Sequence, residues 1–456
     1  MVLSHSNKYL MSNLNFIISL FNIDYVPNID FEKTTPIVDG VNKKLNLYLL
    51  RTIFKCPSCD SRIFVRDTRK EFIKHVLRGG EACTIVFHKR RFYCPVCESI
   101  ISEKLEGFKY NKGVSEALDL EILSRLRDAS LTYKKVGELL NVSTTYVINT
   151  FDKYVDIKRH RLPEVLSIDE IYSDSLSNRS KYCLILYDPI NKIIIDVVDS
   201  RKKKHLIEYL RRIKYEEREK VKYVTIDLYR AYRSVSSVYL DKALIVADSF
   251  HVIENLNRLF DRVRLRVMKR YEDYKNDKDF NYWLFKKYFK YLLMDFDSIS
   301  DKHTYFEKKD MYINKYYIRD RMLELDKELD EAYNLKEEFR YFNLNYKDCI
   351  NLKEILEGEI DVFMHSSIEE MNEFGRLLIH WRSEILNSFK DVNGMRLSNA
   401  CIERKNEEIR KLFLISHGFT NFKRARNRIL FSLNKDEPIL SQKKDKTLAR
   451  KIRIKK

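Results

Sequence analysis

Two cysteine pairs constrain the fold of this chain more than any other feature of its sequence. They are Cys56-Pro57-Ser58-Cys59 and Cys94-Pro95-Val96-Cys97, which repeat one Cys-Pro-x-Cys pattern. Two residues between the thiolates let a tight turn direct both sulfurs at one ion, and two such turns complete a tetrahedral site. The sequence therefore predicts a structural Zn²⁺ held by Cys56, Cys59, Cys94 and Cys97. The alternative is four buried thiols without a ligand.

The segment between these pairs is predicted to form a hairpin, with a strand over residues 84–93 that leads into the second pair. Five of the eight cysteines lie between Cys56 and Cys97. This clustering favours metal binding over disulfides. Cys83, His75 and His88 belong to the same segment, but a four-sulfur site does not need them, and we expect them in packing or surface roles.

The composition indicates a globular protein with an anionic partner. The chain has 456 residues, with 85 Lys and Arg against 67 Asp and Glu, which gives a net charge of +18. The length predicts about two to four domains, and nucleic acid is the commonest partner of so basic a chain. No stretch is long and apolar enough to span a bilayer. We therefore expect a cytoplasmic protein without a membrane partner, associated with the nucleoid when it is bound to DNA.

Residues 115–154 have the pattern of three short helices. Thr132 is predicted to cap the second helix and Ser143 the third, with a three-residue turn over 141–143 between them. This geometry places a recognition helix in the major groove of DNA. An ordinary three-helix bundle is the alternative. The residues predicted to contact DNA are Thr144, Thr145, Tyr146 and Asn149 of that helix, and Lys89, Arg90 and Arg91 of the basic segment before it.

After Pro163 the sequence changes to strands and helices in alternation. The apolar runs 165–168, 221–226 and 243–247 lead into Asp169, Asp227 and Asp248. Two further strands are predicted over 181–187 and 193–198. Open α/β sheets build their sites where the strands end, so three such aspartates predict a site at one sheet edge. A single aspartate of this kind is more often a helix cap or a surface residue.

A charged and aromatic stretch from about residue 260 to residue 390 predicts an all-helical insertion. A last helix then contains Ser398-Asn399-Ala400-Cys401-Ile402-Glu403-Arg404-Lys405-Asn406-Glu407. Glu403 and Asn406 lie three residues apart and therefore share one side of this helix.

In this order, the motifs resemble those of the DDE transposases of bacterial insertion sequences, specifically the ISL-three family. The resemblance covers residues 13–433, and its most specific parts are residues 247–252 and 398–406, with Gly418-Phe419-Thr420-Asn421-Phe422 in support. It implies an RNase H-like domain with a helical insertion before the last acid. It also implies that Asp169, Asp227 and Glu403 are the catalytic acids, supported by Asp248, His251 and Asn406. The family usually has a glycine where this chain has Arg404.

Three carboxylates suit a Mg²⁺ (or Mn²⁺) site, because these cations prefer oxygen ligands. Two ions about 4 Å apart would stabilise the attacking and leaving oxygens of an in-line displacement. We expect water to cut at an element end, and the freed 3′ hydroxyl to attack target DNA. The expected partners are double-stranded DNA, as terminal inverted repeats and target, and further copies of the chain in a homodimer or higher oligomer. Glu170 is expected to point away from the site, because side chains alternate along a strand.

The predicted fold class is a multidomain α+β protein, with a zinc ribbon and helix-turn-helix before an RNase H-like α/β catalytic domain that a large all-helical insertion interrupts. Recognition of element ends is expected within the first 160 residues and is expected to be separable from cutting. One alternative is a DNA-binding regulator with an inert RNase H-like domain. Another is a nuclease or resolvase that hydrolyses DNA without joining it. The expected segments are a helical segment (1–50), the zinc ribbon (51–105), the helix-turn-helix (106–160), the first part of the catalytic core (161–260), the helical insertion (261–394), the last core helix (395–435) and a basic tail (436–456).

Overall fold

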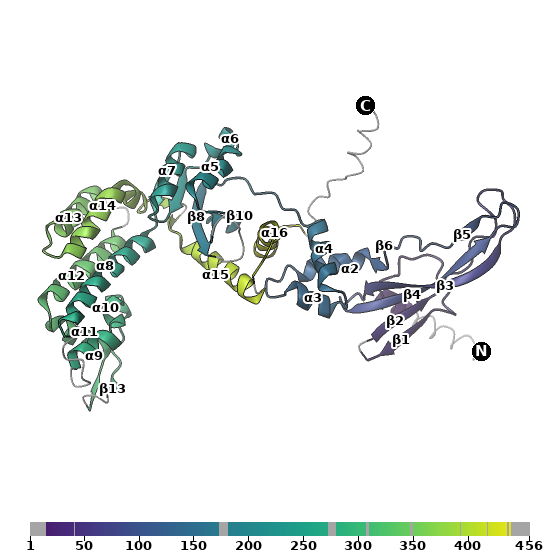
Figure 1. Cartoon of the computed structure of the whole chain (residues 1–456), viewed down its shortest axis with the longest axis horizontal. Coiled ribbons are helices and arrows are strands. Elements are labelled where there is room, and N and C mark those ends of the chain that lie inside the picture. The colour runs from purple at the N-terminus through teal and green to yellow at the C-terminus, as the bar shows by residue number, and fades with distance from the viewer. Residues whose placement is uncertain are drawn as a thin grey trace. The chain divides into compact units, whose positions relative to one another are not determined.

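The computed structural model of this chain describes residues 15–40, 42–172, 181–271, 280–306, 310–346, 350–392, 394–416, 418–435 and 437–438. Two compact units make up the chain (Figure 1). Unit 1 contains residues 1–158, 411–419 and 423–456, and unit 2 contains residues 159–410 and 420–422. Apart from residues 437 and 438, the predicted basic tail lies outside the described residues.

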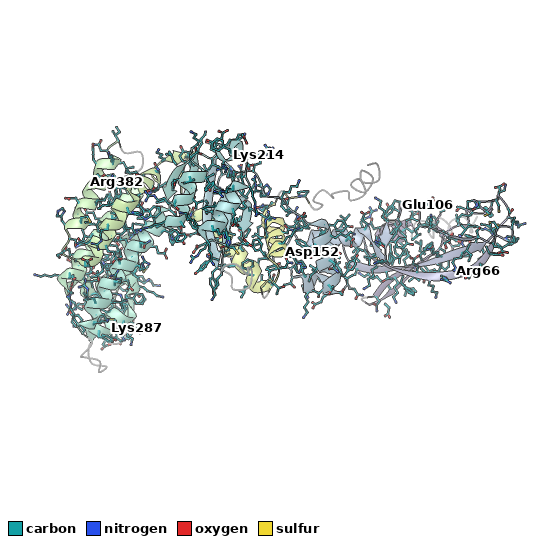
Figure 2. All side chains as sticks on the ribbon, turned by 45° about the horizontal axis from the view of Figure 1, so that its top comes forward. Arg66, Glu106, Asp152, Lys214, Lys287 and Arg382 are labelled. Atoms are coloured by element: carbon teal, nitrogen blue, oxygen red, sulfur yellow. The ribbon has the colours of Figure 1, made fainter. Side chains whose placement is uncertain are left out.

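A seven-stranded sheet forms most of unit 1. Its strands follow the order β1-β2-β4-β3-β7-β6, with β5 paired to β4. The strands are β1 (Thr35–Asp39), β2 (Asn42–Leu47), β3 (Phe64–Val76), β4 (Ala82–Tyr93), β5 (Ile100–Ser102), β6 (Tyr110–Asn111) and β7 (Val114–Ser115). β3 and β4 form the antiparallel hairpin that the sequence predicts between the cysteine pairs. Near Arg66, labelled in Figure 2, most β3 side chains are exposed.

The first 50 residues differ from the predicted helical segment. Among the described residues of this segment, residues 15–20 are helical, whereas β1 and β2 occupy most of residues 35–47. Leu45 and Leu47 are fully buried and alternate with polar residues. This period of two favours a strand, and β2 pairs in parallel with β4. The segment predicted to form a zinc ribbon is thus one end of a larger sheet.

The predicted three helices follow the sheet. They are α2 (Glu116–Arg125), α3 (Tyr133–Leu139) and α4 (Thr144–Tyr154). The Thr132 and Ser143 hydroxyls accept hydrogen bonds from the amides of Lys135 and Tyr146, so both predicted caps are present. These bonds satisfy amides that the first turn of a helix leaves without partners.

Helix α16 (Phe422–Leu433) completes this helical group, although the sequence placed it in the catalytic core. Phe431 packs edge-on against Phe151 of α4. The guanidinium of Arg428 is almost fully buried and donates to the carbonyls of Asp128 and Leu131, between α2 and α3. The fold formed by the first 160 residues therefore includes a helix that comes from much later in the chain.

The second sheet lies in unit 2 and has the strand order β10-β9-β8-β11-β12. Strands β8, β9 and β10 are antiparallel neighbours, whereas β11 and β12 run parallel to β8. β8 and β9 are almost wholly buried, as expected of strands covered on both faces. The strands are β8 (Val165–Tyr172), β9 (Tyr182–Asp188), β10 (Ile193–Val198), β11 (Tyr223–Ile226) and β12 (Leu244–Ala247), and the helices between them are α5 (Lys203–Arg211), α6 (Tyr215–Arg218) and α7 (Arg230–Tyr239).

A helical region follows β12 and shares one hydrophobic core with this sheet. Arg266 of α8 pairs with Glu328 of α12 and Glu370 of α14, which ties three long helices together. The elements are α8 (Ser249–Lys269), α9 (Phe280–Lys287), α10 (Lys290–Leu293), the 3-10 helix η2 (Phe296–Ser298), α11 (Lys315–Glu324), α12 (Lys327–Asn345), α13 (Leu352–His365) and α14 (Glu369–Asn387).

The predicted all-helical insertion also contains short hairpins. One pairs β13 (Thr304–Phe306) with β14 (Met311–Ile313), and the other pairs β15 (Asp391–Val392) with β16 (Met395–Arg396). Helix α15 (Ala400–Ile415) follows, with its residues up to Arg410 in unit 2 and the remaining residues in unit 1. Within the part of the chain that the structure describes, no helix is long and apolar enough to cross a membrane.

Candidate active site and metal centres

The register of the second sheet places three aspartates at one level. Thr225 of β11 pairs with Ser167 of β8, and Ile226 of β11 pairs with Ala247 of β12. If these registers are extended to the ends of the strands, Asp227 lies level with Asp169 on one side and with Asp248 on the other. Adjacent parallel strands in register present side chains at the same level. The predicted edge with three carboxylates is therefore present, although β8 continues three residues beyond Asp169.

Asp169 is the most enclosed of the predicted catalytic acids, with 7% of its surface exposed. Its Oδ2 accepts a hydrogen bond of 2.7 Å from Asn406 Nδ2, and its Oδ1 accepts one from the amide of Glu170. Burial raises the pKa of Asp169 to about 7, and the charges of Asp227 and Glu403 also raise it. Without a cation, this carboxylate is thus half-protonated near neutral pH.

Asp227 has a similar electrostatic environment. Burial raises its pKa to about 6, and the negative charge of Glu170 adds to the rise. Glu170 itself binds Arg201 (2.5 Å) and accepts a hydrogen bond from the Tyr232 hydroxyl, so it does not share the partner of Asp169. The negative charge of Glu170 nevertheless raises the pKa of Asp227, so Glu170 contributes to the electrostatics of the site.

Glu403 reaches this sheet edge through a contact made by Asn399. The amide of Asn399 donates to Asp248 Oδ1 (3.0 Å), and its side chain accepts a hydrogen bond from Thr225 Oγ1 (2.6 Å). Asn399 Nδ2 also donates to the carbonyl of Ile168. One fully buried side chain thus fixes the start of α15 against β8 and β11. From the sequence, Asn399 is named only within the Ser-Asn motif, and its position four residues before Glu403 is the signal that points to a positioning role.

The helix that carries Glu403 is continuous. Arg404, which replaces the glycine usual in the resembled family, is exposed and leaves the helix unbroken. Burial raises the pKa of Glu403, and the charge of Asp248 raises it further.

Asp248, His251 and Glu403 form a group of potential metal ligands, with ligand atoms all within 4.8 Å of one another. Within the described residues, the predicted set of Asp169, Asp227 and Glu403 does not form such a close group, although the three charges interact. Burial alone would lower the pKa of His251. A hydrogen bond to Glu254 and the nearby aspartates outweigh that effect and raise it. When it is protonated, His251 offsets part of the negative charge.

Two oxygens beside these acids suit a cation. Asp248 Oδ2 and Asn406 Oδ1 are buried and accept no hydrogen bond from the described part of the chain. A buried acceptor without a partner is costly, and hard oxygens of this kind are the ligands that Mg²⁺ prefers. The acid site thus has the donor atoms that a divalent cation needs.

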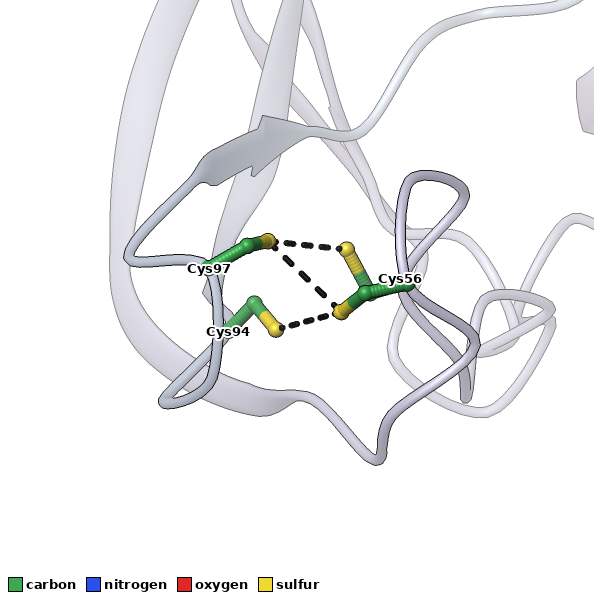
Figure 3. A group of neighbouring side chains, drawn as sticks. Cys56, Cys94 and Cys97 are labelled. Atoms are coloured by element: carbon green, nitrogen blue, oxygen red, sulfur yellow. Dashed lines mark hydrogen bonds between the residues drawn. The ribbon is translucent and has the colours of Figure 1, made fainter.

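The four predicted zinc ligands meet at the end of the first sheet. The Sγ atoms of Cys56 and Cys97 are 3.5 Å apart, those of Cys59 and Cys94 are 3.4 Å apart, and those of Cys59 and Cys97 are 3.7 Å apart (Figure 3). Sulfurs at about 2.3 Å from a tetrahedral Zn²⁺ are separated by about 3.8 Å. The cluster therefore fits a zinc ribbon.

Both cysteine turns have the same backbone. The amide of Cys56 donates to the carbonyl of Ser61, and the amide of Cys94 donates to that of Ser99. Asp60 and Glu98, which follow the second cysteine of each pair, both have positive φ values of 56° and 54°. An amide hydrogen bond from Ser58, aided by the Ser99 hydroxyl, lowers the pKa of Cys56 to about 6, which favours the thiolate that zinc binds.

The other three candidates in this segment have structural contacts, as expected. Cys83 is buried in the core of the first sheet. His75 bonds to the Ser115 hydroxyl and the Phe21 carbonyl, and His88 stacks on Tyr48.

The residues predicted to contact DNA fall into two groups. Thr144, Thr145 and Asn149 are exposed on α4, whereas the Tyr146 hydroxyl donates to Asp119 of α2. In the basic segment, every predicted side chain has an acidic partner: Lys89 pairs with Glu71, Arg90 with Glu103 and Arg91 with Asp67.

Comparisons with known proteins identify the family of this chain. The family model for ISL3 transposases matches residues 166–429, which is more than half of the chain and contains Asp169, Asp227, Asp248 and Glu403. The transposase for insertion sequence element IS1001 of Bordetella parapertussis is 23% identical over 229 residues. The aligned region is 49% of this chain and 56% of that protein, so the chain matches about half the length of this curated relative.

Proposed function

Since this chain belongs to the ISL3 family of DDE transposases, we propose that it binds the terminal inverted repeats of its insertion sequence and catalyses strand cleavage and strand transfer. The main observation in support is that Asp169, Asp227 and Asp248 lie side by side at the ends of neighbouring strands. Asn399 holds the helix of Glu403 against this row. The strand order, with the antiparallel β8, β9 and β10 beside the parallel β11 and β12, supports an RNase H-like core. The match to the IS1001 transposase supports the same class of reaction.

Asp169, Asp227 and Glu403 are the proposed ligands of Mg²⁺ (or Mn²⁺). When bound, the two ions stabilise the attacking and leaving oxygens of an in-line displacement at phosphorus. The residues of the chain prepare this site: Asn406 orients Asp169, and Asn399 fixes the position of α15. Asp248 and His251, which lie nearest Glu403, complete the site, and His251 offsets part of the repulsion between Asp248 and Glu403.

Recognition of the element ends is assigned to unit 1. Thr144, Thr145 and Asn149 are proposed to contact base edges in the major groove, because they are exposed on α4. Tyr146 is proposed to position this helix through Asp119. The ion pairs of Lys89, Arg90 and Arg91 reduce, but do not remove, their attraction for phosphate. Two ends must be joined to one target, which supports a homodimer or higher oligomer on the DNA, at the nucleoid of the cell.

The experiment compares cleavage and joining of a duplex that contains the element end, with Mg²⁺ present. Asp169→Asn, Asp227→Asn and Glu403→Gln keep the size of each side chain but remove its charge. Each should reduce cleavage and joining by orders of magnitude while the affinity for the end persists. Glu407→Gln is the matched control, because Glu407 is exposed one turn along α15 from Glu403.

The outcomes separate the candidate functions. A Glu403→Gln protein that cuts at the wild-type rate would exclude Glu403 from the site, and Glu254 would be the next candidate. A wild-type protein that cuts but never joins would be a nuclease. End binding without any metal-dependent cleavage would favour the regulator.

A further inference from the structure

A small hairpin lies beside the recognition helix. β6 and β7 are joined by Lys112 and Gly113, with φ values of 48° and 71°. Two consecutive positive φ values are typical of the tight turn whose twist matches a two-stranded hairpin. A side chain at Gly113 would come within 2.9 Å of the Phe72 carbonyl, and the amide of Lys74 donates to the Gly113 carbonyl. The hairpin is therefore held firmly against β3.

Helix α4 is fixed opposite this hairpin by one buried acid. Asp119 of α2 accepts hydrogen bonds from the hydroxyls of Tyr146 (2.7 Å), Thr150 (3.4 Å) and Tyr154 (3.2 Å). These three residues lie on one side of α4, so the bonds set the rotation of the helix about its axis. Asn149 consequently remains exposed next to the hairpin.

The hairpin and α4 enclose a cleft of about 400 Å³, which we name the hairpin cleft. Three lysines line it: Lys109 and Lys112 from the hairpin side, and Lys153 from α4. The side chains of Lys109 and Lys153 are 82% and 53% exposed. Both acids of the cleft pair with its lysines: Glu116 faces Lys109 at 3.7 Å, and Asp119, which also accepts the three hydroxyls, faces Lys153 at 3.4 Å. The lysines that line the cleft nevertheless outnumber its acids by one, and the exposed amides of Asn111 and Asn149 are further donors.

We propose that the hairpin cleft binds the sugar-phosphate backbone of duplex DNA, on the strand that flanks the groove occupied by α4. This inference rests on the proposed function, and it adds a contact that the sequence did not predict. Lysines and amides are the groups that bind phosphate oxygens and fix the register of a protein on DNA without reading the sequence.

The test uses the full chain and two duplexes, one with the element end and one of scrambled sequence. Lys112→Asn removes a charge while keeping a residue that tolerates positive φ, and Lys109→Gln removes the second charge. The double variant should bind both duplexes several-fold more weakly, with an unchanged ratio between them. Each lost phosphate contact should lower the steepness of the plot of log affinity against log salt concentration by about 0.9.

Two control variants make this test specific. Lys192→Asn changes another lysine with positive φ (59°), in the turn between β9 and β10, and should leave the salt dependence unchanged. Glu116→Gln removes a negative charge from the hairpin cleft and should strengthen binding to both duplexes. Circular dichroism melting of each variant checks that the fold is intact.

If the double variant keeps the affinity and salt dependence of the wild type, the hairpin cleft does not bind the DNA backbone. The proposed function would be unaffected by that result. A change confined to the element end would also contradict it, because backbone contacts act on every sequence. A wild-type protein that binds neither duplex would instead overturn the proposed function.

Discussion

The four-cysteine cluster of unit 1 and the acid site of unit 2 can both hold a metal ion, but they are built in different ways. The cluster takes all four ligands from two short turns with the same backbone, and four sulfurs close a tetrahedron. The acid site takes its side chains from β8, α8 and α15, and from the residues that directly follow β11 and β12. It contains buried oxygens that accept no hydrogen bond from the described residues, and carboxylates with raised pKa values.

The difference shows what each site is suited to. A closed site whose ligands are all supplied by the protein stabilises local structure. An open site with poorly satisfied carboxylates is strained without its cation, and it leaves positions for water and substrate. Removal of zinc ligands should therefore unfold part of unit 1, whereas removal of acids should affect the reaction and hardly the fold.

The largest effect is expected when zinc binding is removed. Cys56→Ser with Cys94→Ser should reduce zinc from about one equivalent per chain to none and melt the end of the first sheet, because structural zinc sites contribute about 10 kcal/mol or more to folding. Elemental analysis and circular dichroism measure both results. Cys83→Ser, outside the cluster, should keep its zinc. A double variant that keeps about one equivalent of zinc would show that these cysteines do not bind it.

The next effect concerns α16, which packs in unit 1 although it lies near the end of the chain. The sequence predicts that the first 160 residues are separable from the rest, whereas this helix is part of their fold. Phe431 is almost fully buried against Phe151, with Arg127 over its ring at 4.4 Å. Phe431→Ala should cost about 3–5 kcal/mol of unfolding free energy in denaturant titrations. Phe413→Ala, at a half-buried position, should cost less. A fragment of residues 1–160 that is as stable as unit 1 in the full chain would show that α16 is dispensable.

A smaller effect is expected at Asn399, which positions the acid site without belonging to it. Asn399→Ala removes one of the two hydrogen-bond partners of the buried Thr225 hydroxyl and frees the start of α15. Mg²⁺-dependent cleavage should fall by about 10–100-fold, as for other residues that orient metal ligands, while the affinity for DNA is kept. Asn387→Ala is the control, because it removes a hydrogen bond that the side-chain amide donates to the Ile245 carbonyl in the same unit. Equal cleavage rates in the two variants would refute a positioning role for Asn399.

The last effect is a pH dependence to which the acid site contributes. The pKa values of Asp169 and Asp227 rise from 3.8 to about 7 and about 6 in the folded protein. The folded chain thus binds more protons than the unfolded chain between these limits, so the stability of the metal-free protein falls as pH rises from about 4 to about 7. Mg²⁺ binds the ionised forms, so its stabilising effect should grow over the same range. Melting temperatures with and without Mg²⁺ measure this difference, which Asp169→Asn should reduce. A Mg²⁺ effect independent of pH would contradict these pKa shifts.

The sequence by itself determined the features that depend on neighbouring residues. The cysteine spacing defined the metal cluster, Thr132 and Ser143 began their helices, and the strands ending near Asp169, Asp227 and Asp248 formed one sheet. These features are predictable because turn geometry, capping and strand periodicity act over a few residues. The edge at which the aspartates meet followed from a general rule for open sheets.

Only the tertiary structure decided which distant residues meet. It brought Glu403 closest to Asp248 and His251, gave Asn399 its contacts with β8 and β11, and packed α16 against the helices of unit 1. It also paired Arg90 and Arg91 with acids, although the sequence marked them as free to bind DNA. Such contacts leave no local pattern, because the free energy that selects them comes from burial and hydrogen bonding between segments far apart in the chain.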